Sequence, residues 1–140
     1  MATLTVALMD PPYETPATTT AFRIIESALQ KGHAVNVFAY EGAVNLAMAG
    51  QAPHANPVKG TTAEEEDHPT TKDWVASLFT TYPGKVAWIN CGLCADERGA
   101  NDSVPGPVRG SPKEFVEWVN GSDQTLVIPA KEEVISCPRS

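Results

Sequence analysis

Two cysteines follow a strand-like apolar run in Lys85-Val86-Ala87-Trp88-Ile89-Asn90-Cys91-Gly92-Leu93-Cys94. The apolar residues predict a buried strand, and the polar stretch Ala95-Asp96-Glu97-Arg98 after them is compatible with a short helix. Cys91 is therefore expected at a strand-to-helix junction, where unpaired backbone N–H groups and the helix dipole favour a thiolate. The stretch predicts sulfur chemistry at this junction.

The spacing of these two thiols is compatible with more than one role. Cys91 and Cys94 could be small buried residues that only fill the core, which is the commoner role of an intracellular cysteine. A C-x-x-C pair beside an alternating strand and helix pattern is, however, a recognised redox signal. We therefore interpret Cys91 and Cys94 as candidate catalytic residues.

Away from the cysteines, strand-like and helix-like segments alternate along the chain. Apolar runs predict strands at residues 3–9, 34–40, 85–90 and 124–128. Helical periodicity is found at residues 18–31, 71–79 and 111–119, and more weakly at 43–48. Ser111-Pro112-Lys113-Glu114 has the residues of a capping box with proline at the first helical position. The alternation predicts an α/β fold with a mostly parallel sheet of four or five strands sandwiched by helices.

The length of the chain, 140 residues, is that of one domain. We assign residues 1–129 to this domain and expect an irregular surface loop at about residues 50–70, where the periodicity disappears. That loop holds three prolines, two of the three histidines and the acidic run Glu64-Glu65-Glu66-Asp67. Residues 130–140, which include Cys137, are expected to form a flexible C-terminal tail.

Charge and composition exclude several classes of protein. A net charge of -7 argues against direct nucleic-acid binding, which requires clustered Lys and Arg. The sequence has no basic N-terminal segment followed by a long apolar stretch, so we expect neither a secretory signal nor a membrane span. Three unevenly spread cysteines do not resemble a disulfide framework, which favours a cytoplasmic location.

Polar residues follow three of the predicted strands. In a parallel sheet the carboxyl ends of the strands meet at one edge, where ligands and catalytic groups gather. Tyr13, Glu14 and Glu41 follow the first two strands and could support Cys91 at that edge. Ordinary loop polarity or helix capping is the alternative explanation for these three side chains.

Four segments together resemble the DsrE/TusD group of sulfur-relay proteins. They are Asp10-Pro11-Pro12-Tyr13, Lys31-Gly32-His33-Ala34-Val35-Asn36-Val37-Phe38, Glu41-Gly42-Ala43-Val44, and Cys91 followed by Arg98-Gly99. The resemblance extends roughly from Thr3 to Ile128, and it depends on the order and spacing of the segments rather than on any one of them.

The resemblance implies a DsrE-like α/β sandwich that carries sulfane sulfur as a persulfide on Cys91 and passes it between partner thiols. Pathways of the sulfur-oxidation or tRNA-thiolation type are implied, with rhodanese-like or TusA-like donor and acceptor proteins. The family assembles into homo-oligomers, trimers or hexamers, or into mixed hexamers with related subunits. Arg98 would add positive potential, and small Gly92 would leave room for a donor thiol. Cys94 has no obligatory counterpart in the family pattern.

Other readings of the same residues stay open. A thioredoxin-like thiol-disulfide oxidoreductase would also use C-x-x-C, and a non-catalytic flavodoxin-like binding module would suit the topology. A zinc site made of the two cysteines and two of His33, His54 and His68 lacks paired ligand spacing. We therefore expect neither a metal nor a cofactor.

Overall fold

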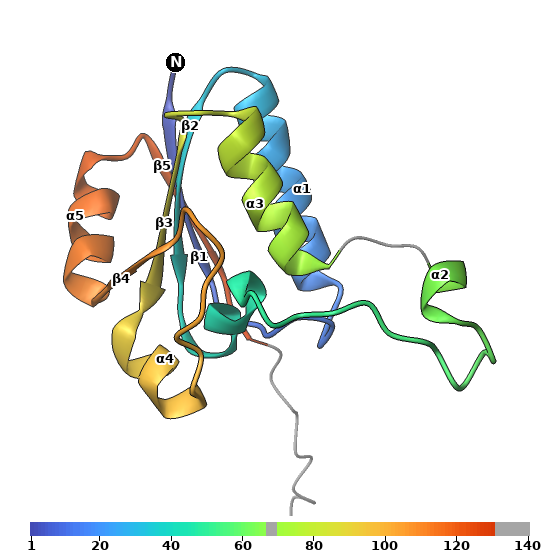
Figure 1. Ribbon diagram of the computed structural model, residues 1–140. Helices are drawn as coiled ribbons and strands as arrows, with labels where there is room; N and C mark the ends of the chain where they lie inside the picture. Colours follow the sequence, from blue (N-terminus) through green and yellow to red (C-terminus); the bar gives the residue numbers. More distant parts are fainter. Residues whose placement is uncertain (67–69, 131–140) are drawn as a thin grey trace, which may run out of the picture.

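The computed structural model describes residues 1–66 and 70–130. Among these residues five strands form one sheet (Figure 1). The strands are β1 (Thr3–Leu8), β2 (Ala34–Ala39), β3 (Val86–Cys91), β4 (Val108–Gly110) and β5 (Gln124–Ile128). Their order is β4-β3-β2-β1-β5, and every neighbouring pair is parallel. The predicted parallel α/β fold is confirmed.

The helices lie on both faces of this sheet. They are α1 (Ala17–Gln30), the 3-10 helix η1 (Glu41–Ala47), α2 (Ala63–Glu66), α3 (Thr71–Thr81), α4 (Gly92–Arg98) and α5 (Pro112–Gly121). Helices α1 and α3 cover one face, whereas α5 lies on the other (Figure 1). The chain steps in one direction from β1 to β4 and then returns across the sheet to β5. Because crossovers between parallel strands are right-handed, this reversal moves α5 to the opposite face.

The larger core lies between the sheet and the helices α1 and α3. Its largest fully buried side chains include Phe22, Ile25 and Trp88, and the Phe22 ring stacks on the Trp88 ring at 6.1 Å between centroids. Ile24, which the helical periodicity assigned to the apolar face of α1, is 37% exposed, and its neighbour Phe22 is buried instead. The core face of α1 is therefore rotated slightly from the predicted one.

A smaller core lies on the α5 side of the sheet. Phe38 of β2 stacks on Phe115 of α5 at 5.2 Å between ring centroids, and both cysteines belong to this second cluster. The single helix leaves part of the face open, since Val127 of β5 is 49% exposed and Val116 of α5 is 56% exposed. The two faces of the sheet are thus unequally covered.

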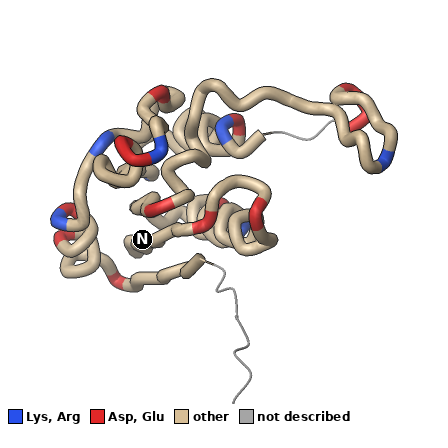
Figure 2. Tube along the Cα trace, turned by 90° about the horizontal axis from the view of Figure 1, so that it is seen from below, with Lys and Arg blue, Asp and Glu red and all other residues tan. Residues whose placement is uncertain are grey.

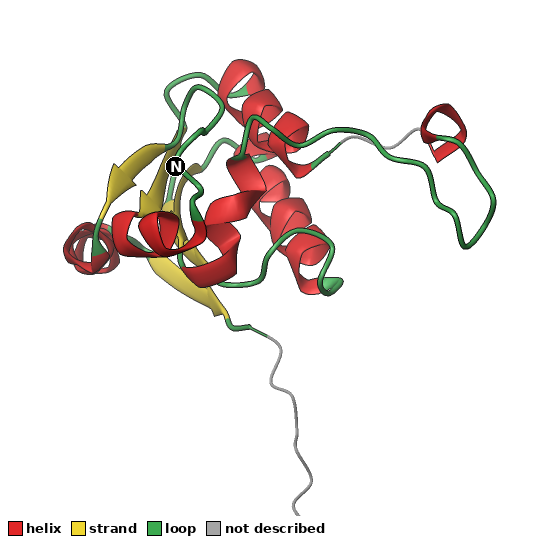
Figure 3. Ribbon diagram, turned by 60° about the horizontal axis from the view of Figure 1, so that its bottom comes forward, coloured by secondary structure: helices red, strands yellow, loops and turns green. Residues whose placement is uncertain are grey.

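The structure adds elements that the sequence patterns did not predict. Strand β4 lies in a stretch predicted to be irregular, and it is only three residues long between Pro107 and Ser111. The four-residue helix α2 lies in the predicted loop of residues 50–70, and this helix projects from the body of the molecule (Figure 3). Such short elements carry too few residues to show a period.

The predicted C-terminal tail, Cys137 and His68 lie outside the described residues, so the domain limits remain predictions. Within residues 1–66 and 70–130, none of the helices is long and apolar enough to span a membrane.

Candidate functional site

Cys91 is the last residue of β3 and the N-cap residue of α4. It pairs in register with Gly110 of β4, and the preceding Asn90 pairs with Arg109. Gly92 then begins α4, and a Cβ atom on this residue would lie 2.8 Å from the guanidinium carbon of Arg109. The absence of a side chain at Gly92 therefore admits Arg109. We expected Gly92 to leave room for a donor thiol, but the Arg109 side chain occupies that space.

Both thiols are buried on the α5 side of the sheet. Cys91 is 2% exposed and Cys94 is 9% exposed, and both contribute to the cluster that contains Phe38, Val44 and Ile89. Both are free thiols. In this conformation neither sulfur is open to a large partner.

The backbone of Glu41 contacts the second thiol. The Glu41 N–H donates a hydrogen bond to Cys94 Sγ at 3.2 Å, and Glu41 has a φ of 52°, a left-handed conformation that is uncommon for a residue other than glycine. Burial raises the pKa of the Cys94 thiol, the Glu41 N–H opposes this rise, and the neighbouring Cys91 side chain adds to it. Cys94 is consequently a protonated thiol at neutral pH.

Arg109 forms an ion pair over the start of α4. Its two terminal nitrogens donate to the two carboxylate oxygens of Asp96 at 2.8 and 2.7 Å. Hydrogen bonding from Arg109 holds the pKa of the Asp96 carboxyl below its usual value, with a smaller contribution from Asn101. Arg109 is also close enough to Cys91 for the two to interact electrostatically. The ion pair thus joins the edge strand β4 to the helix that follows Cys91.

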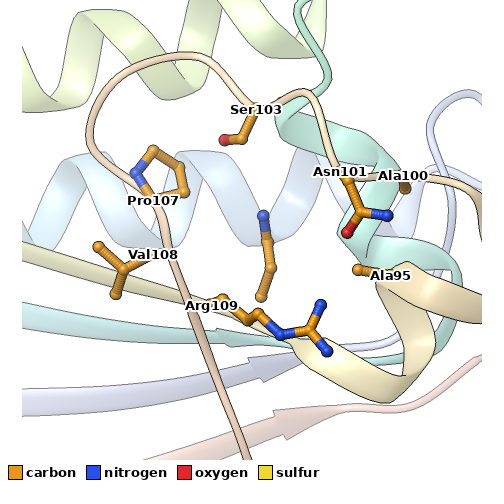
Figure 4. Close-up of a pocket in the computed structure, with 8 residues that line it drawn as sticks. Ala95, Ala100, Asn101, Ser103, Pro107, Val108 and Arg109 are labelled. Carbon is orange, nitrogen blue, oxygen red and sulfur yellow. The ribbon is translucent and has the colours of Figure 1, made fainter.

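A cavity of about 150 Å³ lies beside this ion pair. Figure 4 shows Arg109 extending from β4 towards α4, with Ala95 and Asn101 across from it. The remaining lining residues are Asn90, Ala100, Ser103, Pro107 and Val108. The cavity is large enough for a small polar molecule, although Cys91 does not line it.

A second cavity, of about 260 Å³, lies at the carboxyl ends of β1 and β2. Its lining contains three of the predicted supporting residues, Glu14, Glu41 and Arg98. The two loops meet closely, because a Cβ atom at Gly42 would lie 2.7 Å from Pro11 Cδ. The structure therefore gathers these charged side chains at one edge, but not around Cys91.

The other predicted candidates lie elsewhere. Tyr13 is 59% exposed, and its ring lies edge-on to the His54 ring at 6.5 Å between centroids. His33 Nδ1 accepts a hydrogen bond from the backbone N–H of Ala2. Within residues 1–66 and 70–130, no three His, Cys, Asp or Glu side chains are grouped so as to hold a metal ion.

Arg109 is the functional residue that the sequence patterns missed. The stretch around it was interpreted as irregular, so nothing indicated that it pairs with the cysteine-bearing strand. One signal was present, namely a second Arg-Gly pair, Arg109-Gly110, after Arg98-Gly99. The later pair, Arg109-Gly110, is the one that lies beside Cys91, because β4 pairs with β3.

Comparison with known proteins agrees with this architecture. The crystal structure of the YchN protein from E. coli superimposes with a TM-score of 0.74 at 19% sequence identity, covering 91% of this chain and 100% of YchN. This likeness shows the fold. No curated protein matches the sequence. The profile of the DsrE/DsrF-like family matches residues 2–128, and the chain therefore belongs to the DsrE/DsrF-like family, as its resemblance to the DsrE/TusD group predicted.

Proposed function

We propose that this protein carries sulfane sulfur as a persulfide on Cys91 and passes it between partner thiols. Membership of the DsrE/DsrF-like family supports a function of the sulfur-relay type. The observation that carries the assignment to Cys91 is its place at the end of β3 and the start of α4. The N-terminus of α4, with the Arg109 guanidinium against the adjacent Gly92, favours a thiolate and a persulfide anion at Cys91.

The chemistry requires two exchanges. The Cys91 thiolate attacks the sulfane sulfur of a donor persulfide, the sulfur-sulfur bond of the donor breaks, and the donor leaves as a thiolate. The outer sulfur of the resulting Cys91 persulfide is then attacked by an acceptor thiolate, and Cys91 leaves as a thiolate. Electrons balance in each exchange, so no cofactor takes part.

Exchange requires movement around the sulfur, because Cys91 is 2% exposed. Arg109 is the side chain best suited to move. Its side chain and that of Asp96 are 57% and 52% exposed. An exposed ion pair of this kind restrains its partners only weakly.

The proposal extends to partners and location. We expect donor and acceptor proteins of the rhodanese or TusA kind, in the cytoplasm, and assembly as a homo-oligomer, trimeric or hexameric, or with related subunits. The open apolar area beside α5 supports self-association, since a cavity of about 350 Å³ there is lined by Ala7, Met9, Phe38, Tyr40, Pro112, Phe115 and Val127.

Lys and Arg are spread over the described residues without forming one cluster (Figure 2).

Intact-mass analysis after brief exposure to inorganic polysulfide tests the proposal. The wild type and Cys94→Ser should each gain the mass of sulfur in a form that thiol reductants remove, whereas Cys91→Ser should not. Peptide mapping assigns the added sulfur to a residue and separates Cys91 from Cys137. The assignment fails if Cys91→Ser gains labile sulfur as the wild type does.

A further inference from the structure

The two thiols of the site are buried in one cluster of side chains rather than opening separately to solvent. Cys91 caps α4 and Cys94 lies three residues later, a spacing that brings side chains together on one side of a helix. Both side chains belong to the same buried cluster, and the Cys91 side chain is one of the neighbours that raise the pKa of the Cys94 thiol. The nearest nucleophile to a persulfide on Cys91 is therefore Cys94.

We infer that Cys94 discharges the Cys91 persulfide within the chain, releasing hydrosulfide and leaving a Cys91–Cys94 disulfide. This inference rests on the proposed function, because it starts from a persulfide on Cys91. It adds a sulfide-releasing activity to the relay, with small sulfane-sulfur compounds such as inorganic polysulfide as the source of sulfur. Cys94 is then a catalytic residue, since its sulfur contacts the reacting atoms.

The step balances without another reactant. The Cys94 thiol gives its proton to the outer sulfur of the persulfide, and its sulfur attacks Sγ of Cys91. The bond between Sγ and the outer sulfur breaks, and the outer sulfur leaves with the bonding pair as hydrosulfide. The outer sulfur is reduced, the Cys94 sulfur is oxidised, and one negative charge is present on each side. A dithiol reductant returns the disulfide to the starting state.

Burial favours this internal route over transfer to another protein. A partner's thiolate must displace the chain around a sulfur that is 2% exposed, whereas Cys94 is already beside it. A nucleophile held next to its target reacts with an effective concentration far above that of any free thiol.

Two neighbouring groups stabilise the negative charge that develops on sulfur during this step. The Glu41 N–H, 3.2 Å from Cys94 Sγ, stabilises that sulfur as it gives up its proton. Arg109, which lies against Gly92 next to Cys91 in the chain, favours the departing hydrosulfide anion. Neither group has to be brought in from elsewhere.

The test follows one loaded sulfur over time. Reduced full-length protein is exposed briefly to inorganic tetrasulfide, separated from the reagent by gel filtration, and then analysed for intact mass and for released sulfide. The wild type should lose the added sulfur at least about ten-fold faster than Cys94→Ser. It should end two hydrogens lighter than the starting protein, with one sulfide released per disulfide.

Control variants separate this inference from the proposed function. Cys137→Ser should behave as the wild type, because Cys137 takes no part. Cys94→Ala, whose thermal unfolding is measured alongside, should retain the persulfide as Cys94→Ser does. If the wild type keeps its sulfur as long as Cys94→Ser, the inference fails and the carrier function stands. If Cys94→Ser gains no sulfur at Cys91, the carrier function itself fails.

Discussion

Arg109 connects two parts of the site that are distant in sequence. It lies on β4, contacts the start of α4 at Gly92, and pairs with Asp96 one turn further along that helix. Because both members of the ion pair are exposed, its effect on stability is small. At the scale of the residue, the site is a buried sulfur at the start of a helix whose next residue packs against an exposed arginine.

Releasing Arg109 should expose Cys91. In Asp96→Asn the guanidinium keeps its charge but loses its ionic partner, so the rate of Cys91 alkylation by iodoacetamide should rise by about three-fold. The rate is measured by quenching and peptide mapping. Glu97→Gln removes a neighbouring carboxylate that does not bind Arg109, and its rate should match the wild type. Equal rates for both variants would show that Arg109 does not limit access.

The Cys94 thiol should make stability depend on alkaline pH. Burial raises its pKa in the folded protein above the ordinary value of 9.0, so the unfolded chain loses this proton first as pH rises. The stabilisation is complete below pH 9.0 and is lost as pH rises through the folded-state pKa. Denaturant unfolding at a series of pH values should therefore show a steeper alkaline decline for the wild type than for Cys94→Ala. Parallel curves would contradict the raised pKa.

Individual elements differ in how much of them the sequence reveals. Ser111-Pro112-Lys113-Glu114 predicted the start of α5 because a capping box depends only on residues within one turn, and the structure contains that box. Strand β4 depends instead on β3, its partner in the sheet, and its three residues give no pattern of their own. Arg109 was missed for the same reason. The sequence predicted the strand that carries Cys91, but it did not predict that β4 and Arg109 lie beside that strand.

The capping box of α5 has a measurable contribution. Ser111→Ala should lower the free energy of unfolding by about 1 kcal/mol, because the first turn of α5 loses its side-chain acceptor. Glu114 also loses the Ser111 hydroxyl that holds the pKa of its carboxyl below the usual value. Ser77→Ala, in an exposed position of α3, is the control and should change stability by less than about 0.5 kcal/mol. A loss no larger than the control's would show that the box is not stabilising.

The whole molecule has two unlike faces. Helices α1 and α3 cover one side of the sheet, and α5 alone lies on the other (Figure 1). Alternating strand and helix patterns predicted the layers, because each pattern is local to its segment. They did not predict the strand order, since a sequence does not show which strand β5 will join. The uneven cover of the two faces follows from that order.

Self-association through the α5 side should be sensitive to charge. Val127→Lys places an ammonium on the apolar area beside α5, so the oligomer that we propose should dissociate to smaller species in sedimentation velocity. Val58→Lys is a matched control, because Val58 is 94% exposed in the projecting loop and should leave the distribution unchanged. Persistence of the wild-type oligomer in Val127→Lys would place the interface elsewhere.

The shortness of β4 has a consequence for motion. A three-residue strand at the edge of a sheet pairs on one side only, so it can open locally at a free energy well below that of global unfolding. Backbone amides of Val108 and Arg109 should accordingly exchange with deuterium much faster than those of β1, which lies between two strands. Equal protection would exclude such fraying. Fraying of β4 then uncovers the edge of β3 at Cys91, while the rest of the fold stays intact.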